Sequence, residues 1–312
     1  MKSGKFEFSY DLSGLNTWAN ENANEMFIKA FLGEVLPKYA TVRPNIRGTE
    51  KVGVMENTIY FQDGDLCGFN ESGTTAISQV TIETCSKKLN QSLCPYTLYD
   101  YYLTQRLSSS NFQEEVPFAE LLVQDISNRA AQEIEKQLWQ NDKASGDCFD
   151  GVLELVTSGN GATQITYSAT TSSNALEVFS TLYANLPSNV VHLNDITIFC
   201  SYADYRNLIQ DMTLKSYVNL FTMDSAGAAT GAEWAVKLPS TNVTVRPTVG
   251  LDGQSAMVIG PSSYYQVGFN SSANGGMELK TIYDPYEDTV KVMARMVYGL
   301  GIFSIDSFAI AK

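Results

Sequence analysis

The chain has 312 residues, of which 44% are hydrophobic and 18% charged, a composition typical of a globular protein with a large core. Its 34 acidic and 21 basic residues give a formal charge of -13, which argues against a nucleic-acid-binding protein held by phosphate contacts. No charged segment followed by an apolar one opens the chain, and its longest uncharged run, residues 155–176, is too polar to cross a bilayer. We therefore expect a chain that folds in a cytosol and has no membrane segment.

Residues 1–40 predict an N-terminal arm with a short extended start and one helix. In WANENANEMFIKAFLGEVLPK, apolar side chains recur at helical spacing from Trp18 to Phe31. Pro37 is expected to end this helix.

Residues 41–95 have the texture of strands and turns. The stretches NTIYFQ and SQVTIETCSKKL flank the turn-rich DGDLCGFNESGTT, which predicts a long two-stranded β-hairpin. The segment has few core residues for its length, and an isolated hairpin is marginally stable in water. We therefore expect it to pack on something else, such as another chain.

The strongest helical pattern covers residues 113–141. Apolar residues recur every four positions, so the stripe that they form drifts around the helix: Phe118, Leu122, Ile126, Ala130, Ile134 and Leu138. Such a helix touches several elements in succession, as a spine would.

Residues 148–168 predict short strands around a glycine-rich turn, and an α/β segment follows. It contains a helix in SSNALEVFSTLYANLP, a buried strand in DITIFCS and a helix in YADYRNLIQDM. The remainder, from about residue 232, returns to strands, with at least three after residue 276.

The strand TVKVMARMVY near the C-terminus has two different faces. Its core face carries Val290, Val292, Ala294, Met296 and Tyr298. Lys291 and Arg295 lie on the other face, where they either solvate a half-covered sheet or meet carboxylates of a neighbouring subunit. Gly299 and Gly301 predict a tight break before a last strand, in which Phe308 and Ile310 share a face.

A search for catalytic or metal-binding patterns finds none. The only histidine, His192, lacks a nucleophile elbow and is interpreted as an ordinary loop or strand-edge residue, even though Asp195 follows closely. The segment Asp63-Gly64-Asp65 lacks the spacing of a calcium loop and indicates a solvated turn. Gly299-Leu300-Gly301 lacks the third glycine of a dinucleotide motif.

The cysteines and aromatic residues are also interpreted as structural. The five cysteines are odd in number and scattered, so we expect reduced, mostly buried thiols: Cys67, Cys85, Cys94, Cys148 and Cys200. The tyrosine clusters YTLYDYY and SSYYQ have no basic residues interleaved, which favours core and protein–protein contacts.

The order of these parts resembles that of the major capsid proteins of tailed bacteriophages, which share the Hong Kong 97 fold. ITIFCSYADYRNLIQDM is similar to the strand–helix pair of that family's axial domain. The strand with its arginine, the glycine break and FSIDSFAIA resemble the family's usual ending.

This resemblance implies an α+β fold with five parts. They are an N-terminal arm (1–40), an extended hairpin or E-loop (41–95), a peripheral domain containing the spine helix (96–170), an axial α/β domain (171–270) and terminal strands that return to the peripheral domain (271–312).

The function implied is that of a major capsid protein, which self-assembles as hexamers and pentamers into the icosahedral head around a double-stranded DNA genome. Such a protein is a structural part of the virion, is assembled in the host cytoplasm, and has no catalytic site, cofactor or metal. The expected partners are other copies of the chain, a portal, decoration proteins and DNA contacted without sequence specificity. A separate scaffolding protein is also expected, since no long charged helical segment precedes the arm. Arg295 and Lys291 are the candidate inter-subunit contacts.

Three alternatives remain open. A shell protein of an encapsulin-like nanocompartment would have the same fold. A β-rich enzyme could bring polar residues together without a sequence motif. The tyrosine clusters would suit a carbohydrate-binding module.

Overall fold

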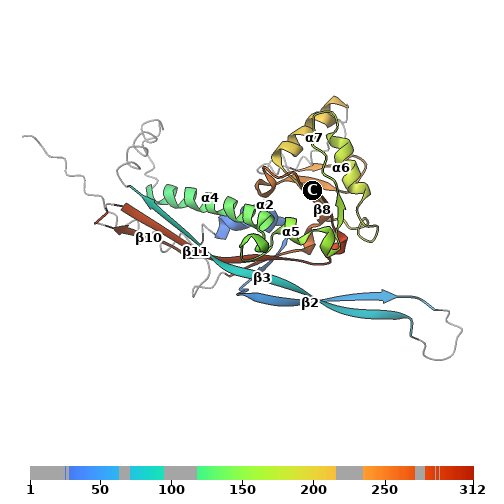
Figure 1. The fold of residues 1–312 in the computed structure, drawn as a ribbon, viewed down its shortest axis with the longest axis horizontal. Helices are drawn as coiled ribbons and strands as arrows, with labels where there is room; N and C mark the ends of the chain where they lie inside the picture. The colour runs from blue at the N-terminus through green and yellow to red at the C-terminus, as the bar shows by residue number, and fades with distance from the viewer. Residues whose placement is uncertain are drawn as a thin grey trace, which may run out of the picture. The chain divides into compact units, whose positions relative to one another are not determined.

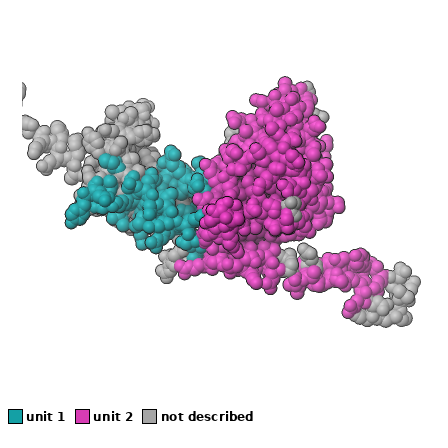
Figure 2. All heavy atoms as spheres, viewed as in Figure 1, with its two compact units in different colours: residues 1–34, 86–134, 270–298 teal, residues 35–85, 135–269, 299–312 magenta. Residues whose placement is uncertain are grey.

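The computed structural model describes residues 25, 28–62, 71–94, 118–215, 235–270, 278–284, 286–287 and 289–312. The chain divides into two units, which Figure 2 colours separately. Unit 1 comprises residues 1–34, 86–134 and 270–298, and unit 2 comprises residues 35–85, 135–269 and 299–312.

Unit 2 contains a six-stranded sheet, sheet B, with the strand order β4-β12-β8-β5-β7-β6. Its strands are β4 (Thr163–Ile165), β5 (Ile196–Cys200), β6 (Val236–Lys237), β7 (Thr244–Pro247), β8 (Met257–Pro261) and β12 (Ala309–Ala311). β5 pairs parallel with β7 and antiparallel with β8, and β12 pairs antiparallel with β8 and parallel with β4. Every residue of β5 is buried, as its uninterrupted apolar sequence predicts.

Two helices pack on sheet B and lie side by side in Figure 1, α6 (Ala175–Ala184) and α7 (Tyr202–Leu214). Phe179 of α6 and Leu208 of α7 are completely buried in one hydrophobic core with β5 and β8. α7 begins directly after β5 because Ser201 caps it: the hydroxyl accepts a hydrogen bond from the Asp204 N–H at 3.1 Å. The α/β segment predicted from the sequence is confirmed here.

The second sheet, sheet A, has the order β1-β9-β11-β3-β2, and β10 also pairs with β11. Its strands are β1 (Thr41–Pro44), β2 (Thr49–Ile59), β3 (Gly73–Leu93), β9 (Tyr265–Phe269), β10 (Glu278–Asp284) and β11 (Thr289–Ile302). β2 and β3 form an antiparallel hairpin, which Figure 1 shows as a long ribbon, in register from Thr49 opposite Glu83 to Ile59 opposite Gly73. The predicted two-stranded segment is therefore present.

The long helix α4 extends over Phe118–Gln140. Ile126, Ala130, Ile134 and Leu138 are each at most 5% exposed, which confirms this part of the predicted stripe. The side chains of Phe118 and Leu122, like residues 113–117, lie outside the described residues.

An aromatic cluster in unit 2 joins the end of α4 to both sheets. The rings of Trp139 and Phe199 lie 5.2 Å apart, those of Phe199 and Tyr265 5.6 Å apart, and those of Tyr265 and Phe308 5.1 Å apart. A Cβ at Gly250 would overlap with the ring of Trp139, so the cluster depends on a glycine for its packing. Tyr265, from the sequence cluster SSYYQ, is thus a core residue as predicted.

The remaining helical elements are short. Among the described residues they are the helical residues 28–33, α2 (Val35–Tyr39), α5 (Val152–Leu155) and the 3-10 turns η1 (Lys143–Ser145), η2 (Ser158–Asn160), η4 (Val249–Leu251), η5 (Ser262–Tyr264) and η6 (Ile305–Ser307). With two sheets and few helices among the described residues, the predicted mixed α and β class is confirmed at that level.

Two local predictions are wrong. Pro37 does not end a helix; it lies in the first turn of α2, where a missing N–H costs no intrahelical hydrogen bond. Val152–Leu155, predicted as part of a strand region, forms the helical turn α5, in which the Val156 N–H donates to the Val152 carbonyl.

The end of the chain also differs from expectation. β11 continues without a break through Gly299 and Gly301 to Ile302. The glycines instead allow a close approach to β3, because a Cβ at Gly299 would overlap with the Glu83 carbonyl oxygen and one at Gly301 would lie 2.8 Å from the Thr81 carbonyl oxygen.

The last strands of the chain are divided between the two units. Residues 270–298 belong to unit 1 and residues 299–312 to unit 2. β12 completes sheet B, where both of its neighbours, β4 and β8, hydrogen-bond to it. This position in the sheet buries both faces of the apolar segment Phe308–Ala311.

Candidate assembly site

The two candidate cations lie on the expected face of β11. Val292, Ala294, Met296 and Tyr298 are each at most 4% exposed, so the alternate residues form the core face as predicted. Arg295 is exposed on the opposite face. The structure thus confirms the strand register, while an inter-subunit role of either cation stays a prediction.

Lys291 already has two carboxylate partners in its own hairpin of β10 and β11. Its Nζ atom lies 2.7 Å from an oxygen of Asp284 and 2.7 Å from an oxygen of Glu287. The hydrogen bond to Asp284 raises the pKa of Lys291, and the same bond lowers the pKa of Asp284. These contacts fix the loop between the two strands.

Arg295 differs from Lys291 in its surroundings. It is paired across the strands with Glu278, directly opposite in the register of β10 and β11. Among the described residues, no hydrogen bond or ion pair of its guanidinium is found. A planar group with five donors is therefore exposed on a strand, where it could form a two-pronged bond with a carboxylate.

The β2–β3 hairpin carries exposed apolar side chains that sequence reasoning did not single out. Met55 and Ile77 are directly opposite in register and are 64% and 76% exposed. Ile59, four residues after Met55 on the same face of β2, is 73% exposed. We call these three residues the hairpin apolar face. The alternation Met55, Asn57, Ile59 was a signal that could have revealed it.

The root of the hairpin is attached to the loop that follows α4. Lys143 in this loop forms an ion pair of 2.8 Å with Glu83 of β3. Two residues further along β3, Cys85 is disulfide-bonded to Cys148, with the Cα atoms 6.2 Å apart. In the structure this pair is a disulfide and not the expected pair of reduced thiols, because the fold brings together cysteines 63 residues apart, a proximity that their spacing in the sequence does not show.

The other cysteines divide between buried and exposed positions. Cys200 is buried, as predicted, and burial raises the pKa of its thiol. Cys94 is exposed, contrary to the expectation of mostly buried thiols. Cys67 lies outside the described residues.

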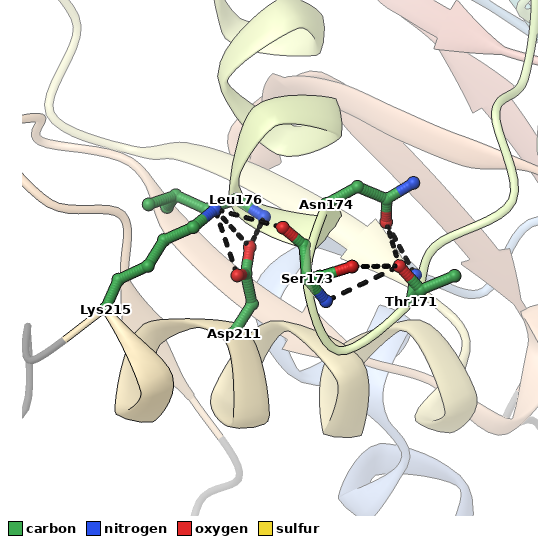
Figure 3. Close-up of polar contacts among 6 residues, drawn as sticks. All are labelled: Thr171, Ser173, Asn174, Leu176, Asp211 and Lys215. Atoms are coloured by element: carbon green, nitrogen blue, oxygen red, sulfur yellow. Dashed lines mark hydrogen bonds and ion pairs between the residues drawn. The ribbon is translucent and has the colours of Figure 1, made fainter.

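A polar cluster in unit 2 joins α6 to α7 (Figure 3). The carboxylate of Asp211 is completely buried and points toward Lys215, whose Nζ atom lies 2.9 Å from it. It also accepts a hydrogen bond of 2.7 Å from the Leu176 N–H, in the first turn of α6, and Lys215 donates to the Ser173 carbonyl at 3.2 Å. These contacts connect the first turn of α6 to the last turn of α7, so the cluster holds the two helices together.

A second buried carboxylate, Asp204, acts in a similar way. Its oxygens accept hydrogen bonds from Ser201 at 2.8 Å, Tyr167 at 2.9 Å and Thr170 at 2.5 Å. Burial, followed by the hydrogen bond to Asp204, raises the pKa of Tyr167. The network ties the strand end to the segment before α6.

The remaining sequence candidates do not converge on a reactive centre. His192 lies in an exposed turn, and Asp195 accepts hydrogen bonds from the Ser263 hydroxyl at 2.5 Å and N–H at 3.3 Å. The Asp-Gly-Asp segment at residues 63–65 and the tyrosine cluster at residues 96–102 lie outside the described residues. In the described ranges, no group of three His, Cys, Asp or Glu side chains could hold a metal ion. None of the helices described there has the length and apolarity needed to cross a bilayer.

Comparison with solved structures finds the same fold in particle shells. The satellite phage P4 procapsid including size determination (Sid) protein is similar with a TM-score of 0.59 at 11% identity, over 99% of this chain and 93% of that chain. A structure from Gordonia phage Cozz has a TM-score of 0.57 at 12% identity, covering 89% and 86%. The virus-like particle from Pyrococcus furiosus has a TM-score of 0.52 at 11% identity, covering 94% and 98%.

No protein-family model matches the sequence, and no curated protein sequence matches it. The identities to the solved structures are low, so the similarity is one of fold. At that level, the resemblance to phage capsid proteins inferred from the sequence is confirmed.

Proposed function

We propose that this chain is a major capsid protein that assembles into the icosahedral head enclosing the double-stranded DNA of a tailed phage. The observation that carries the proposal is the hairpin apolar face, Met55, Ile59 and Ile77, on a chain with the fold of capsid shells. Monomeric proteins rarely leave such clusters of large apolar side chains exposed, so a partner is expected to cover them. A second copy of the chain meets this need in a closed shell.

The five parts expected from the resemblance belong to this proposal. The β2–β3 hairpin would be the E-loop, α4 the spine helix of the peripheral domain, and sheet B with α6 and α7 the axial domain. In this assignment the hairpin apolar face covers a neighbouring subunit, and Arg295 bonds to an acidic residue of another copy. The role is structural, and a portal and decoration proteins would join the shell.

Electron microscopy of the purified full-length chain tests the proposal. Closed shells are expected, together with fast sedimentation. Stable monomers over a wide range of salt concentration, with a scaffolding protein supplied, would contradict it. In particles from the native source, packaged DNA is expected, whereas a protein cargo would favour a nanocompartment, which the similarity to the Pyrococcus furiosus particle keeps as the second candidate.

A paired substitution tests the hairpin apolar face itself. Replacing Met55 and Ile77 by Thr removes the apolar contact but keeps residues that suit a strand. We expect the yield of shells to fall while the subunit keeps its melting temperature. The matched control is Asn57→Thr, on the same face and opposite Thr75, which should assemble normally. Equal yields for all three proteins would show that the apolar face is not an assembly contact.

A further inference from the structure

At the root of the β2–β3 hairpin, Cys85 of β3 is disulfide-bonded to Cys148 of the loop after α4. Glu83 and Cys85 are two residues apart on β3 and therefore point to the same side of the strand. Both are bonded to the loop after α4, Glu83 to Lys143 and Cys85 to Cys148. Thr84, on the other side, is bonded to the chain in front of β2: its N–H and its hydroxyl each donate to the Gly48 carbonyl at 2.8 Å.

The loop that carries Cys148 is organised by bonds of its own. The Asp142 carboxylate accepts hydrogen bonds from the Ala144 N–H at 2.8 Å and the Ser145 hydroxyl at 2.6 Å. The Lys143 N–H donates to Asp150 at 2.8 Å, and the neighbouring Phe149 is completely buried. Because these contacts and the Lys143–Glu83 ion pair do not involve sulfur, they would hold the two thiols close together before any disulfide forms.

The pair is also accessible from solvent. Cys148 is exposed and Cys85 is half-buried, so a small oxidant can reach the sulfur of Cys148. Cytosolic thiols are kept reduced, whereas disulfides form and persist outside cells. Cys200, by contrast, is buried, and burial raises the pKa of its thiol, so it is not expected to take part.

We propose that Cys85 and Cys148 are a thiol pair while the subunit is made and assembled, and that they become a disulfide that locks the hairpin root once the particle leaves the reducing cytosol. The oxidant is a small disulfide such as oxidised glutathione. The Cys148 thiolate attacks one of its sulfur atoms and releases one glutathione thiolate, and the Cys85 thiolate then attacks the sulfur of Cys148 and releases the second. One protein disulfide forms, two protein thiols lose their protons, and two molecules of reduced glutathione are produced.

The change of compartment rests on the proposed function, but the chemistry of the pair does not. The first measurement therefore follows the thiols in cells. Cells expressing the full-length chain are lysed in a membrane-permeable alkylating agent, and peptides are analysed by mass spectrometry. Cys85 and Cys148 are expected to be alkylated. A Cys85–Cys148 linked peptide already present at lysis would overturn the switch.

The second measurement uses the purified full-length chain in whatever assembly state it adopts. Oxidised glutathione is added to the reduced protein, and the linked peptide Cys85–Cys148 is expected. The variant Cys67→Ser with Cys94→Ser, which changes two cysteines outside the pair, should form the same link, whereas Cys148→Ser should not. Failure of the first variant to form the link would overturn the pairing, even if the chain assembles into shells as proposed.

The third measurement asks whether the link locks the root. Oxidation is expected to raise the melting temperature by about 3 to 6 °C, because it closes a long loop in the unfolded chain. Hydrogen exchange should slow at the amide of Thr84, whose bond to Gly48 holds the hairpin root. Both effects should be absent in Cys148→Ser. Identical melting temperatures and exchange rates in the reduced and oxidised proteins would show that the disulfide does not stabilise the hairpin root.

Discussion

Glu135 in α4 is a completely buried carboxylate that connects distant parts of unit 2. It accepts hydrogen bonds from the Thr248 hydroxyl at 2.6 Å, the Trp139 ring N–H at 2.9 Å and the Leu36 N–H at 3.1 Å. Three donors and complete burial make it a structural junction between α2, α4 and the turn after β7. Burial raises its pKa, and the hydrogen bonds oppose this shift only in part.

Replacing Glu135 with Gln should therefore change how stability depends on pH. The pKa of the Glu135 carboxyl group in the folded protein lies above its usual value of 4.5. The folded chain therefore binds the carboxyl proton more tightly than the unfolded chain does. The resulting stabilisation is present below pH 4.5 and is lost as pH rises through the folded pKa. The free energy of unfolding of the wild type, minus that of Glu135→Gln, should thus fall as pH rises above 4.5. Urea unfolding of both proteins over a pH series measures this difference, and a difference that rises with pH would contradict the assignment.

Gly299 shows how a single missing side chain permits a packing arrangement. A Cβ at this position would overlap with the Glu83 carbonyl oxygen of β3, a backbone atom that cannot move aside on its own. β11 and β3 can therefore approach closely only because the residue is glycine. Gly53 in β2, by comparison, has no atom within 4 Å of a Cβ built on it.

We accordingly expect Gly299→Ala to lower the free energy of unfolding by about 3 kcal/mol, a loss typical of overpacking in a buried site. The matched control is Gly53→Ala, which should change it by no more than about 0.5 kcal/mol. Chemical denaturation of the two variants makes the comparison. If both variants have the stability of the wild type, the close approach of β11 to β3 is not a feature of the folded protein.

At the scale of elements, α4 is stabilised by burial of its apolar stripe more than by the ion pair on its exposed side. Ile126, Ala131, Ile134 and Leu138 are each at most 5% exposed. On the solvent side, the ion pair of Arg129 and Asp125 is exposed and contributes little. The helix thus depends on burial of one side.

An acidic residue in this stripe should strongly destabilise the folded protein. Ile134→Asp places an unpaired carboxylate at a site that is 2% exposed, which costs about 3 to 5 kcal/mol. That loss is a large part of the roughly 5 to 15 kcal/mol that stabilises a typical domain. The control is Gln132→Asp, at an exposed position of the same helix. Thermal melting should separate the two variants, and equal melting temperatures would mean that Ile134 is not in the core.

Elements with a strong local pattern could be predicted from the sequence, whereas contacts between distant segments could not. The spacing of Ile126 to Leu138 and the apolar run of β5 are local signals, and both are confirmed. The partners of β12 are not encoded in its own residues, since an apolar strand suits either sheet. For the same reason, the disulfide between Cys85 and Cys148 could not be predicted from the sequence.

For the candidate site, the sequence predicted the exposed face of β11 but not the partners of its cations. Alternation along the strand placed Lys291 and Arg295 together, and this register is confirmed. That Lys291 pairs with Asp284 and Glu287 depends on the loop between β10 and β11, which brings both carboxylates back to it. Loop geometry of this kind has no periodic signal.

At the scale of the whole molecule, the fold is retained where sequence similarity is not. Identity to the satellite phage P4 procapsid structure is 11%, although the alignment covers 99% of this chain. A fold can persist in this way because many apolar sequences satisfy one set of buried positions. Contacts between subunits are less constrained by the fold, so they must be tested on this chain's own exposed residues.

Arg295 provides that test at the level of assembly. It is exposed on β11, so Arg295→Ala should leave the melting temperature of the subunit unchanged. If its guanidinium bonds to a carboxylate of another copy, the yield of shells should fall for the variant. Salt screens exposed ion pairs, so the wild-type yield should approach that of the variant at high ionic strength.

The control for Arg295→Ala is Lys291→Ala, on the same face. Lys291 is bonded to Asp284 and Glu287 in its own hairpin, so its loss should affect the loop between β10 and β11 more than the contact between subunits. Shell yield and melting temperature, measured at low and high salt for the three proteins, separate the two roles. A lower melting temperature for Arg295→Ala would identify the arginine as an internal pair. Unchanged yield at low salt would identify it as a solvated residue, because an ion pair between copies contributes most where screening is weakest.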